Sequence, residues 1–255
     1  MSGLSRRTAR LFLRSLLIQA GFGDERLQGL GFAWAIDPEL RESYARDAAG
    51  LSRARTRHLE AFNASPAVSG LLLGAAAAAE AAAAAGAPEA VERARVVKTA
   101  FAAPLSGAAD ALFWGALRPL AAAAAICVFI AGRRWGWSHP LFWGAGLGLA
   151  AFNFPSLGAR WLGARRGLEA GASAAAEAAA LPLRRWTALA RVAAGVLVFL
   201  ACAGALSLPF GIRPILAALS FAAGAVLSGR SGGALKLVGA AAMLGAAASA
   251  AGLAP

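Results

Sequence analysis

Two charged side chains, Asp110 and Arg118, interrupt an apolar segment that runs from residue 99 to residue 131, and Trp114 lies between them. Asp110 and Trp114 stand four residues apart, so a helix would carry both on one face. Transporters use charges near interruptions of apolar helices to bind a solute. The alternative is a kinked packing helix whose charges lie at its solvated ends. The residue types leave both interpretations open.

Pro104 and Pro119 should break this segment into pieces. A proline lacks an amide hydrogen and clashes with the carbonyl one turn earlier, which predicts a broken helix over residues 104–119. The residue before Pro119 is also disfavoured in helical geometry. In a membrane, such irregular backbone must be buried in protein or line a cavity.

The composition indicates a membrane protein. The 255 residues are 59% hydrophobic and 15% charged, whereas soluble domains are roughly 25% charged. The net charge of +12 does not indicate nucleic-acid binding, because the bases are scattered between apolar segments without interleaved aromatic residues. We therefore predict an all-α polytopic membrane protein that has no nucleic-acid partner.

Glu80 is the single charge in an earlier apolar segment. Ser65 and Pro66 resemble an N-cap and a first helical residue, and the predicted helix then runs over residues 67–85 to Gly86. Its length of about 28 Å nearly matches a bilayer core. An ionisable group there is a candidate functional residue. The alternative is a soluble or re-entrant helix with a solvated Glu80.

The first 66 residues predict a cytoplasmic and interfacial helical region, and residues 67–255 a membrane domain. Residues 4–20 form an amphipathic helix whose arginines (Arg7, Arg10, Arg14) oppose leucines. Such a helix suits an anionic lipid surface. The charges of residues 21–62 are interpreted as a solvated helical face.

The second half should contain further spanning helices. An apolar helix over residues 141–154 is interrupted near Asn153 and Pro155. The terminal spans are expected at residues 192–208, 214–228 and 237–253. Ten bases lie in residues 1–66 and six in residues 160–191, and the positive-inside rule puts both regions in the cytoplasm. One of the three segments between them should therefore be re-entrant.

The sequence offers no catalytic constellation. His58 lies in a charged stretch and His139 precedes a proline, and neither is in a glycine-rich phosphate loop. Cys127 and Cys202 stand within apolar runs, where they act as small hydrophobic residues. No His or Cys pair has metal-ligand spacing. We expect no metal, no cofactor and no catalysis by this chain alone.

Four motifs in order resemble a known family. They are the Arg14–Ala33 region with its Glu25-Arg26-Leu27-Gln28 run, Phe62-Asn63-Ala64-Ser65-Pro66, the ten residues Asp110–Pro119, and Phe152-Asn153-Phe154-Pro155-Ser156. Together they are similar to the IID subunits of mannose-class sugar phosphotransferase systems. The family's histidines are replaced by Ser65 and Ser156, and its glycine before the aspartate by Ala109.

The resemblance implies a subunit of the bacterial inner membrane with a cytoplasmic N-terminus. It would pair with a IIC subunit, in a higher oligomer of that pair, and pass a hexose inward while cytoplasmic IIA and IIB subunits supply the phosphoryl group. The alternative functions are a regulatory or assembly protein that kept the fold without transport, and a cationic soluble helical protein.

Sugar sites combine carboxylate or amide groups with an aromatic face. Candidates for the substrate pathway or the subunit contact are Asp110, Trp114, Arg118, Asn153, Asn63 and Glu80. Each of the polar residues could instead satisfy backbone groups of broken helices. For Glu80 and Asn63 we favour this structural role, and for Asp110 both roles stay open.

Overall fold

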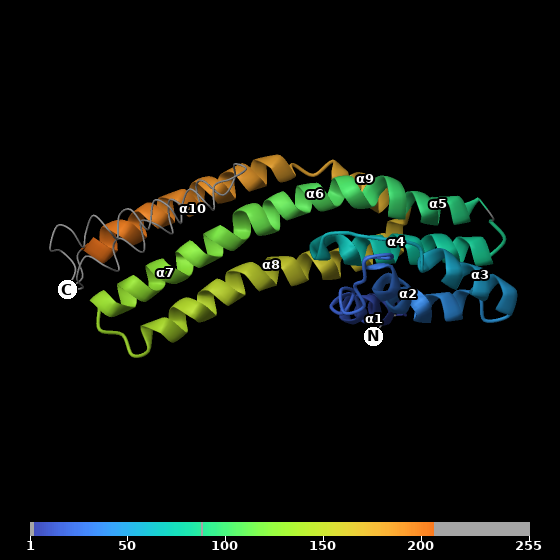
Figure 1. Ribbon diagram of the computed structural model, residues 1–255, viewed down its shortest axis with the longest axis horizontal. Helices are drawn as coiled ribbons and strands as arrows, with labels where there is room; N and C mark the ends of the chain where they lie inside the picture. Colours follow the sequence, from blue (N-terminus) through green and yellow to red (C-terminus); the bar gives the residue numbers. More distant parts are fainter. Residues whose placement is uncertain (1–2, 88, 207–255) are drawn as a thin grey trace. The chain divides into compact units, whose positions relative to one another are not determined.

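The computed structural model describes residues 3–87 and 89–206 of the chain, and its regular elements are helices (Figure 1). The predicted all-α class is confirmed. The elements are α1 (Gly3–Ser15), α2 (Gly29–Ser43), α3 (Ala48–His58), α4 (Pro66–Ala84), α5 (Ala90–Val96), η1 (Val97–Phe101), α6 (Ala102–Leu112), η2 (Phe113–Leu117), α7 (Arg118–Arg134), α8 (Pro140–Ala170), α9 (Ala172–Ala179) and α10 (Leu183–Leu206).

Two compact units divide the chain. The first unit comprises Met1–Ala111 and Phe154–Leu183, and the second comprises Leu112–Asn153 and Arg184–Pro255. Among the described residues, two helices are long and apolar enough to cross a membrane, Pro66–Ala84 and Ala90–Arg134. The predicted spans at residues 214–228 and 237–253 lie outside the described residues, as does the end of the one at 192–208.

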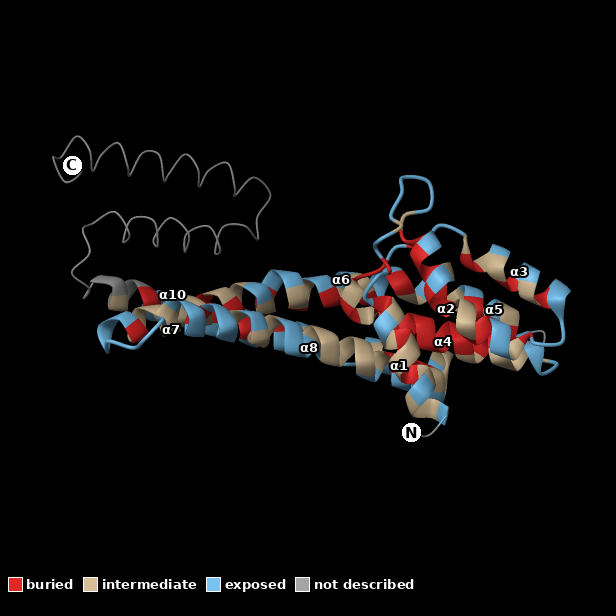
Figure 2. Ribbon diagram, turned by 90° about the horizontal axis from the view of Figure 1, so that it is seen from below, coloured by how far each residue is buried: buried red, intermediate tan, exposed pale blue. Residues whose placement is uncertain are grey.

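Helix α4 is the centre of the first unit. It begins as predicted, with Ser65 at the N-cap position and Pro66 in the first turn, and the chain leaves it at Gly86 with a φ of +102°. Helices α1, α2, α5 and α9 contact α4, and most of its residues are buried (Figure 2). This burial explains why a helix built largely of alanine, with little apolar surface per residue, is stable here.

The N-terminal helix is shorter than predicted and turns its basic face inward. Helix α1 ends at Ser15, and residues 16–20 form turns. Arg7 and Arg10 bind the buried carboxylate of Glu39 in α2, and Arg10 also binds Glu42. These two arginines therefore neutralise acids of the same chain, which overturns the expectation that they form a free basic face for lipid. Leucines of the opposite face, such as Leu13, are exposed.

The segment with Pro104 and Pro119 is one continuous helix and not the separate pieces that we predicted. Helical backbone extends from Ala90 to Arg134. A π-helical turn precedes each proline, η1 before Pro104 and η2 before Pro119. In η2 the amide of Arg118 donates to the carbonyl of Phe113, five residues back. The wider turn removes the clash that a proline ring makes with an α-helix.

Helix α8 also passes through its proline. It runs without interruption from Pro140 to Ala170 with Pro155 inside it, so the predicted break near residue 153 is wrong. The Asn153 amide finds a partner on the same helix, because its Nδ2 donates to the carbonyl of Leu149 at 2.8 Å. A helix tolerates an internal proline where side chains and local adjustment satisfy the freed backbone groups.

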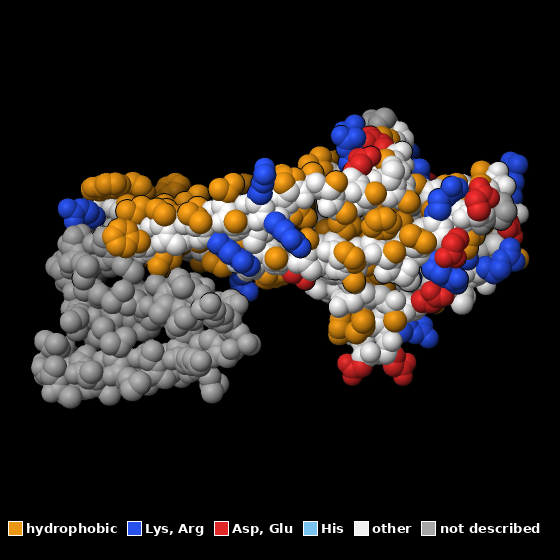
Figure 3. All heavy atoms as spheres, turned by 90° about the horizontal axis from the view of Figure 1, so that it is seen from above, with side chains coloured by type: hydrophobic (Ala, Val, Ile, Leu, Met, Phe, Trp, Pro, Cys, Tyr) orange, Lys and Arg blue, Asp and Glu red, His pale blue; other side chains and the backbone are white. Residues whose placement is uncertain are grey.

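The second unit exposes large apolar side chains on its helices. In α7 and α8 the backbones approach closely at Gly144, beside the carbonyl of Ala125. Cys127 Sγ lies 3.1 Å from the carbonyl of Leu197 in α10. On the face drawn in Figure 3, apolar side chains predominate over this unit. The most exposed include Leu141, Phe142, Leu149, Leu189 and Phe199. Apolar surface of this extent on packed long helices is typical of a membrane protein.

Paired glycines set the spacing of α4 and α8 within the first unit. A Cβ atom on Gly74 would lie 2.5 Å from the carbonyl oxygen of Ala164, and one on Gly167 would collide with the carbonyl oxygen of Leu71. Both helices thus carry glycines four residues apart, Gly70 with Gly74 and Gly163 with Gly167. Small residues at this spacing allow helix backbones to pack closely in membrane proteins.

Gly167→Ala should therefore lower the free energy of unfolding of the purified protein in detergent by about 1–3 kcal/mol, because the new methyl group overpacks a backbone contact. Gly158→Ala is the matched control on the same helix, since nothing lies within 4 Å of its Cβ position. The control should be neutral or slightly stabilising. Equal effects of the two substitutions on denaturant midpoints would contradict this account of the α4–α8 contact.

Candidate functional site

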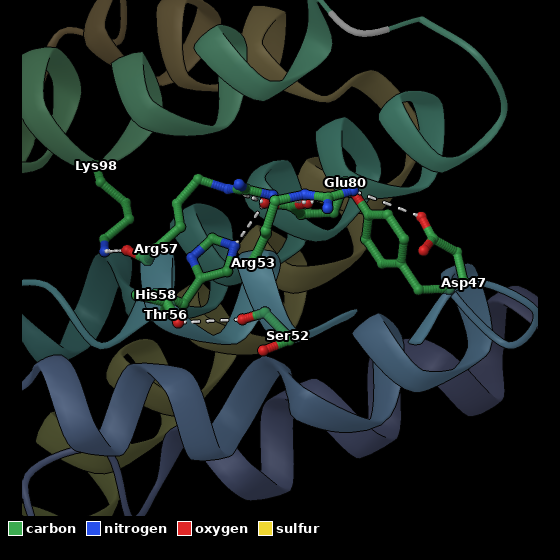
Figure 4. A network of polar contacts seen from close by, with 9 residues as sticks. Asp47, Ser52, Arg53, Thr56, Arg57, His58, Glu80 and Lys98 are labelled. Carbon is green, nitrogen blue, oxygen red and sulfur yellow. Dashed lines mark hydrogen bonds and ion pairs between the residues drawn. The ribbon is translucent and has the colours of Figure 1, made fainter. Parts of the chain in front are cut away.

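Glu80 is fully buried in α4, and its carboxylate is bound by three side chains of α2 and α3 (Figure 4). Arg57 forms a two-pronged ion pair, with Nε 2.9 Å from Oε1 and Nη2 2.8 Å from Oε2. Tyr44 donates its hydroxyl hydrogen to Oε2 at 2.8 Å. His58 Nε2 lies 2.9 Å from Oε1. A carboxylate with this many charge-assisted partners is held in one orientation.

The protonation states follow from this geometry. Burial, with a smaller contribution from the Glu80 hydrogen bond, raises the pKa of Tyr44 to about 12, so its hydroxyl keeps the hydrogen that it donates. Burial lowers the pKa of His58 below its usual value, although Glu80 opposes this shift. The neutral ring donates from Nε2, because a carboxylate only accepts. Its buried Nδ1 has no hydrogen-bond partner among the described residues.

Lys98 connects this cluster to the long helix. The lysine lies in the π-helical turn η1, and its Nζ donates to the carbonyl of Arg57 at 3.1 Å. The ammonium also lies over the ring of Phe32, 5.4 Å from its centroid. The Glu80 cluster (Tyr44, Arg57, His58, Glu80 and Lys98) thus joins α2, α3, α4 and η1. These contacts can hold the four elements together.

Sequence reasoning missed most of this cluster. His58 and Arg57 were interpreted as part of a solvated face, yet His58 is fully buried and Arg57 nearly so. The available signal was Glu80 itself, because a carboxylate on a buried helix needs cationic partners. We predicted that Glu80 satisfies backbone groups of broken helices, whereas the partners of its carboxylate in the structure are the side chains of Tyr44, Arg57 and His58.

Two of the sequence motifs meet in the first unit. The side-chain amide of Gln28 both donates to the carbonyl of Ala64, at 3.0 Å, and accepts from its amide, at 3.1 Å. The amide of Gln28 donates to the carbonyl of Phe62. The Phe62–Pro66 loop is therefore fixed by the earlier motif, while the side chain of Asn63 within it is exposed.

The same loop contacts α6 close to Asp110. The amide of Ser65 donates to Ser106 Oγ at 2.9 Å. Asp110 follows Ser106 by four residues, which puts it on the same face of α6, about 6 Å along. Asp110 is exposed, as is Asn63. The face of α6 that carries Asp110 is thus the face that binds the loop containing Asn63.

Trp114 and Arg118 belong to the second unit. The Trp114 ring packs on Phe152, with centroids 5.5 Å apart, so the third and fourth motifs also meet. The Arg118 guanidinium lies 5.4 Å from the centroid of Trp114. The carbonyl of Gly115, one turn before Pro119, accepts from Arg191, whose Nε lies 3.3 Å from the oxygen. Asn153 is exposed.

Comparison with known proteins identifies what the chain resembles. Residues 5–212 match the family described as the PTS system mannose/fructose/sorbose family IID component. The sorbose-specific EIID component of Klebsiella pneumoniae is 34% identical over 63% of this chain and 56% of its own length. The mannose-specific EIID component of Escherichia coli K12 is 32% identical over 63% of this chain and 54% of its own length. The chain thus spans about half the length of these relatives.

Two solved structures share the fold. A cryo-electron microscopy structure of the mannose transporter ManYZ in complex with microcin E492 matches 79% of this chain and 70% of the other, with a TM-score of 0.58 and 29% identity. A second structure, described as a membrane protein, matches 76% of this chain and 69% of the other, with a TM-score of 0.63 and 31% identity. The predicted membrane nature of the fold is confirmed.

Glu80→Gln should destabilise the purified protein by about 3 kcal/mol, because it leaves the Arg57 charge buried without its counter-charge. The matched control is Glu89→Gln, which removes an exposed acid that lies 3.6 Å from Arg93. Surface pairs of this kind contribute under about 1 kcal/mol. The measurement is the midpoint of thermal unfolding in detergent. If both variants melt with the wild type, the cluster does not hold the helices together.

Proposed function

Since the chain belongs to the mannose/fructose/sorbose family of phosphotransferase IID components, we propose that it is the membrane IID subunit of a sugar-import complex. It pairs with a IIC subunit, and the two form the passage for a hexose that a cytoplasmic IIB subunit phosphorylates after receiving the phosphoryl group from IIA. The observation that carries this proposal is the match to the solved mannose transporter over 79% of the chain at 29% identity.

The chain contributes no phosphoryl carrier in this proposal. A carrier histidine must be accessible to its donor and acceptor, whereas His58 is fully buried and bound to Glu80. His139 is exposed but does not lie in a glycine-rich phosphate loop. The subunit acts in the bacterial inner membrane with its N-terminus in the cytoplasm, and it functions within a higher oligomer of the IIC–IID pair. Leu13 on α1 contacts the lipid surface together with the exposed Leu16 and Leu17 in the turn that follows.

Asp110 and Asn63 are the residues that we assign to the polar pathway. Both side chains are exposed on the first unit; Asp110 shares a face of α6 with Ser106, and Ser106 binds the Phe62–Pro66 loop that contains Asn63. An ionised group on an apolar helix is costly against lipid, so protein or water covers Asp110 in the membrane. The partner subunit supplies that cover, and the carboxylate is available to hydrogen-bond sugar hydroxyls.

Co-expression with a IIC subunit and its IIA and IIB partners tests the proposal. The tagged chain should retain IIC through purification in detergent, and hexose uptake in a host that lacks its own mannose-class system should depend on both. A chain that co-purifies with IIC but whose deletion leaves uptake intact would instead be the regulatory or assembly protein. A chain that IIC ignores contradicts both functions.

Asp110→Asn should leave the IIC complex assembled but lower hexose uptake at least about tenfold, since the substitution keeps the shape of the side chain and removes its charge. Glu177→Gln removes another exposed acid, on α9, and should leave uptake unchanged. Uptake of labelled sugar is measured at equal amounts of co-purified complex. If Asp110→Asn prevents assembly with IIC, the residue is structural and the pathway assignment fails.

A further inference from the structure

The acids and bases of this chain are divided unequally between its units. Every Asp and Glu of the sequence falls in the first unit, while the second unit has arginines and no carboxylate side chain. Two arginines of the second unit contact neutral groups of that unit, Arg191 the carbonyl of Gly115 and Arg118 the ring of Trp114.

The hairpin between α7 and α8 gathers positive charge around a pocket. Helix α7 ends with Arg133 and Arg134, and α8 begins at Pro140. A pocket of about 500 Å³ lies at this end of the two helices, lined by Phe129, Arg133, His139, Pro140, Leu141 and Phe142. His139 has a φ of +57°, so a strained residue closes the hairpin beside the pocket. Its walls thus combine donors for an anion with apolar surface.

Exposed tryptophans are close in the chain to the residues that line the pocket. Trp135 and Trp137 of the hairpin are 67% and 44% exposed, and Trp143 in the first turn of α8 is 57% exposed. Exposed tryptophan beside arginine is the composition found at the headgroup level of a bilayer. Helix α7 has 17 residues, a rise of about 25 Å, so a helix that crosses the apolar core would bring this end to the headgroup layer.

We propose that the hairpin pocket binds the phosphate headgroup of an anionic phospholipid, with Arg133 and His139 facing the phosphate and Leu141 and Phe142 contacting the acyl chains. The apolar walls and the exposed tryptophans favour a lipid over a free phosphate ion, which has no apolar part. A phosphate accepts charge-assisted hydrogen bonds from guanidinium groups, and basic side chains near a bilayer surface attract anionic lipid. The inference stands whether or not the chain transports a sugar.

The test is retention of lipid by the full chain in detergent, measured by native mass spectrometry at increasing concentrations of phosphatidylglycerol or phosphatidylcholine. Wild type should bind phosphatidylglycerol roughly tenfold more tightly than phosphatidylcholine. The double variant Arg133→Gln/Arg134→Gln should lose most of this preference. Arg184→Gln/Arg185→Gln removes two charges from α10 in the same acid-free unit, outside the pocket lining, and should keep it.

A third variant separates loss of charge from misfolding, and competition with inorganic phosphate separates a lipid site from a site for the free ion. Arg133→Lys/Arg134→Lys preserves the charge and should retain a preference for phosphatidylglycerol, which separates loss of charge from failure of the hairpin to fold. Inorganic phosphate at millimolar concentration should not displace the lipid. The proposal is overturned if both glutamine double variants lose binding equally, if the two lipids bind alike, or if inorganic phosphate competes at the affinity of the lipid.

Discussion

The ion pair of Glu80 and Arg57 is the interaction on which the first unit depends. Helix α4 is mostly alanine, glycine and leucine, and such helices pack closely but offer little shape to specify one arrangement. A buried carboxylate with three side-chain donors specifies both the rotation of α4 and the positions of α2 and α3. Removing the Glu80 carboxylate from water costs free energy, and its partners offset that cost only while all of them are present. The residues of the cluster therefore depend on one another.

The second constraint is that each proline frees backbone groups in a helix that must leave none unsatisfied. A π-helical turn precedes both Pro104 and Pro119, and at Pro119 a side chain from α10 also binds the freed carbonyl. Arg191 on Gly115 is the clearest case, because Gly115 is the residue whose carbonyl Pro119 would have served. The Asp110–Pro119 motif is thus a strained helix held by neighbours, a local arrangement often found at functional sites.

The sequence predicted what depends on local patterns and the motif resemblance. The ends of α4 were predicted correctly from Ser65, Pro66 and Gly86, because capping and helix-breaking residues act within one helical turn. The breaks that we predicted at the prolines are wrong. Whether a proline breaks a helix or only widens one turn depends on residues far along the chain, such as Arg191. For the same reason Arg57 and His58 looked solvated: their partner Glu80 lies more than twenty residues away. The meeting of Gln28 with Ala64 is likewise tertiary information.

The division of charge follows from how each unit meets its surroundings. In the first unit, acids and bases compensate one another, as Glu39 does Arg7 and Arg10, so close packing of helices can bury them. The second unit has basic side chains and no Asp or Glu, and its described helices expose large apolar side chains. Carboxylates on its exposed apolar helices would face hydrocarbon at a cost that arginine, which reaches the headgroup layer, avoids. A surface without acids is therefore what a helix hairpin exposed to a bilayer requires.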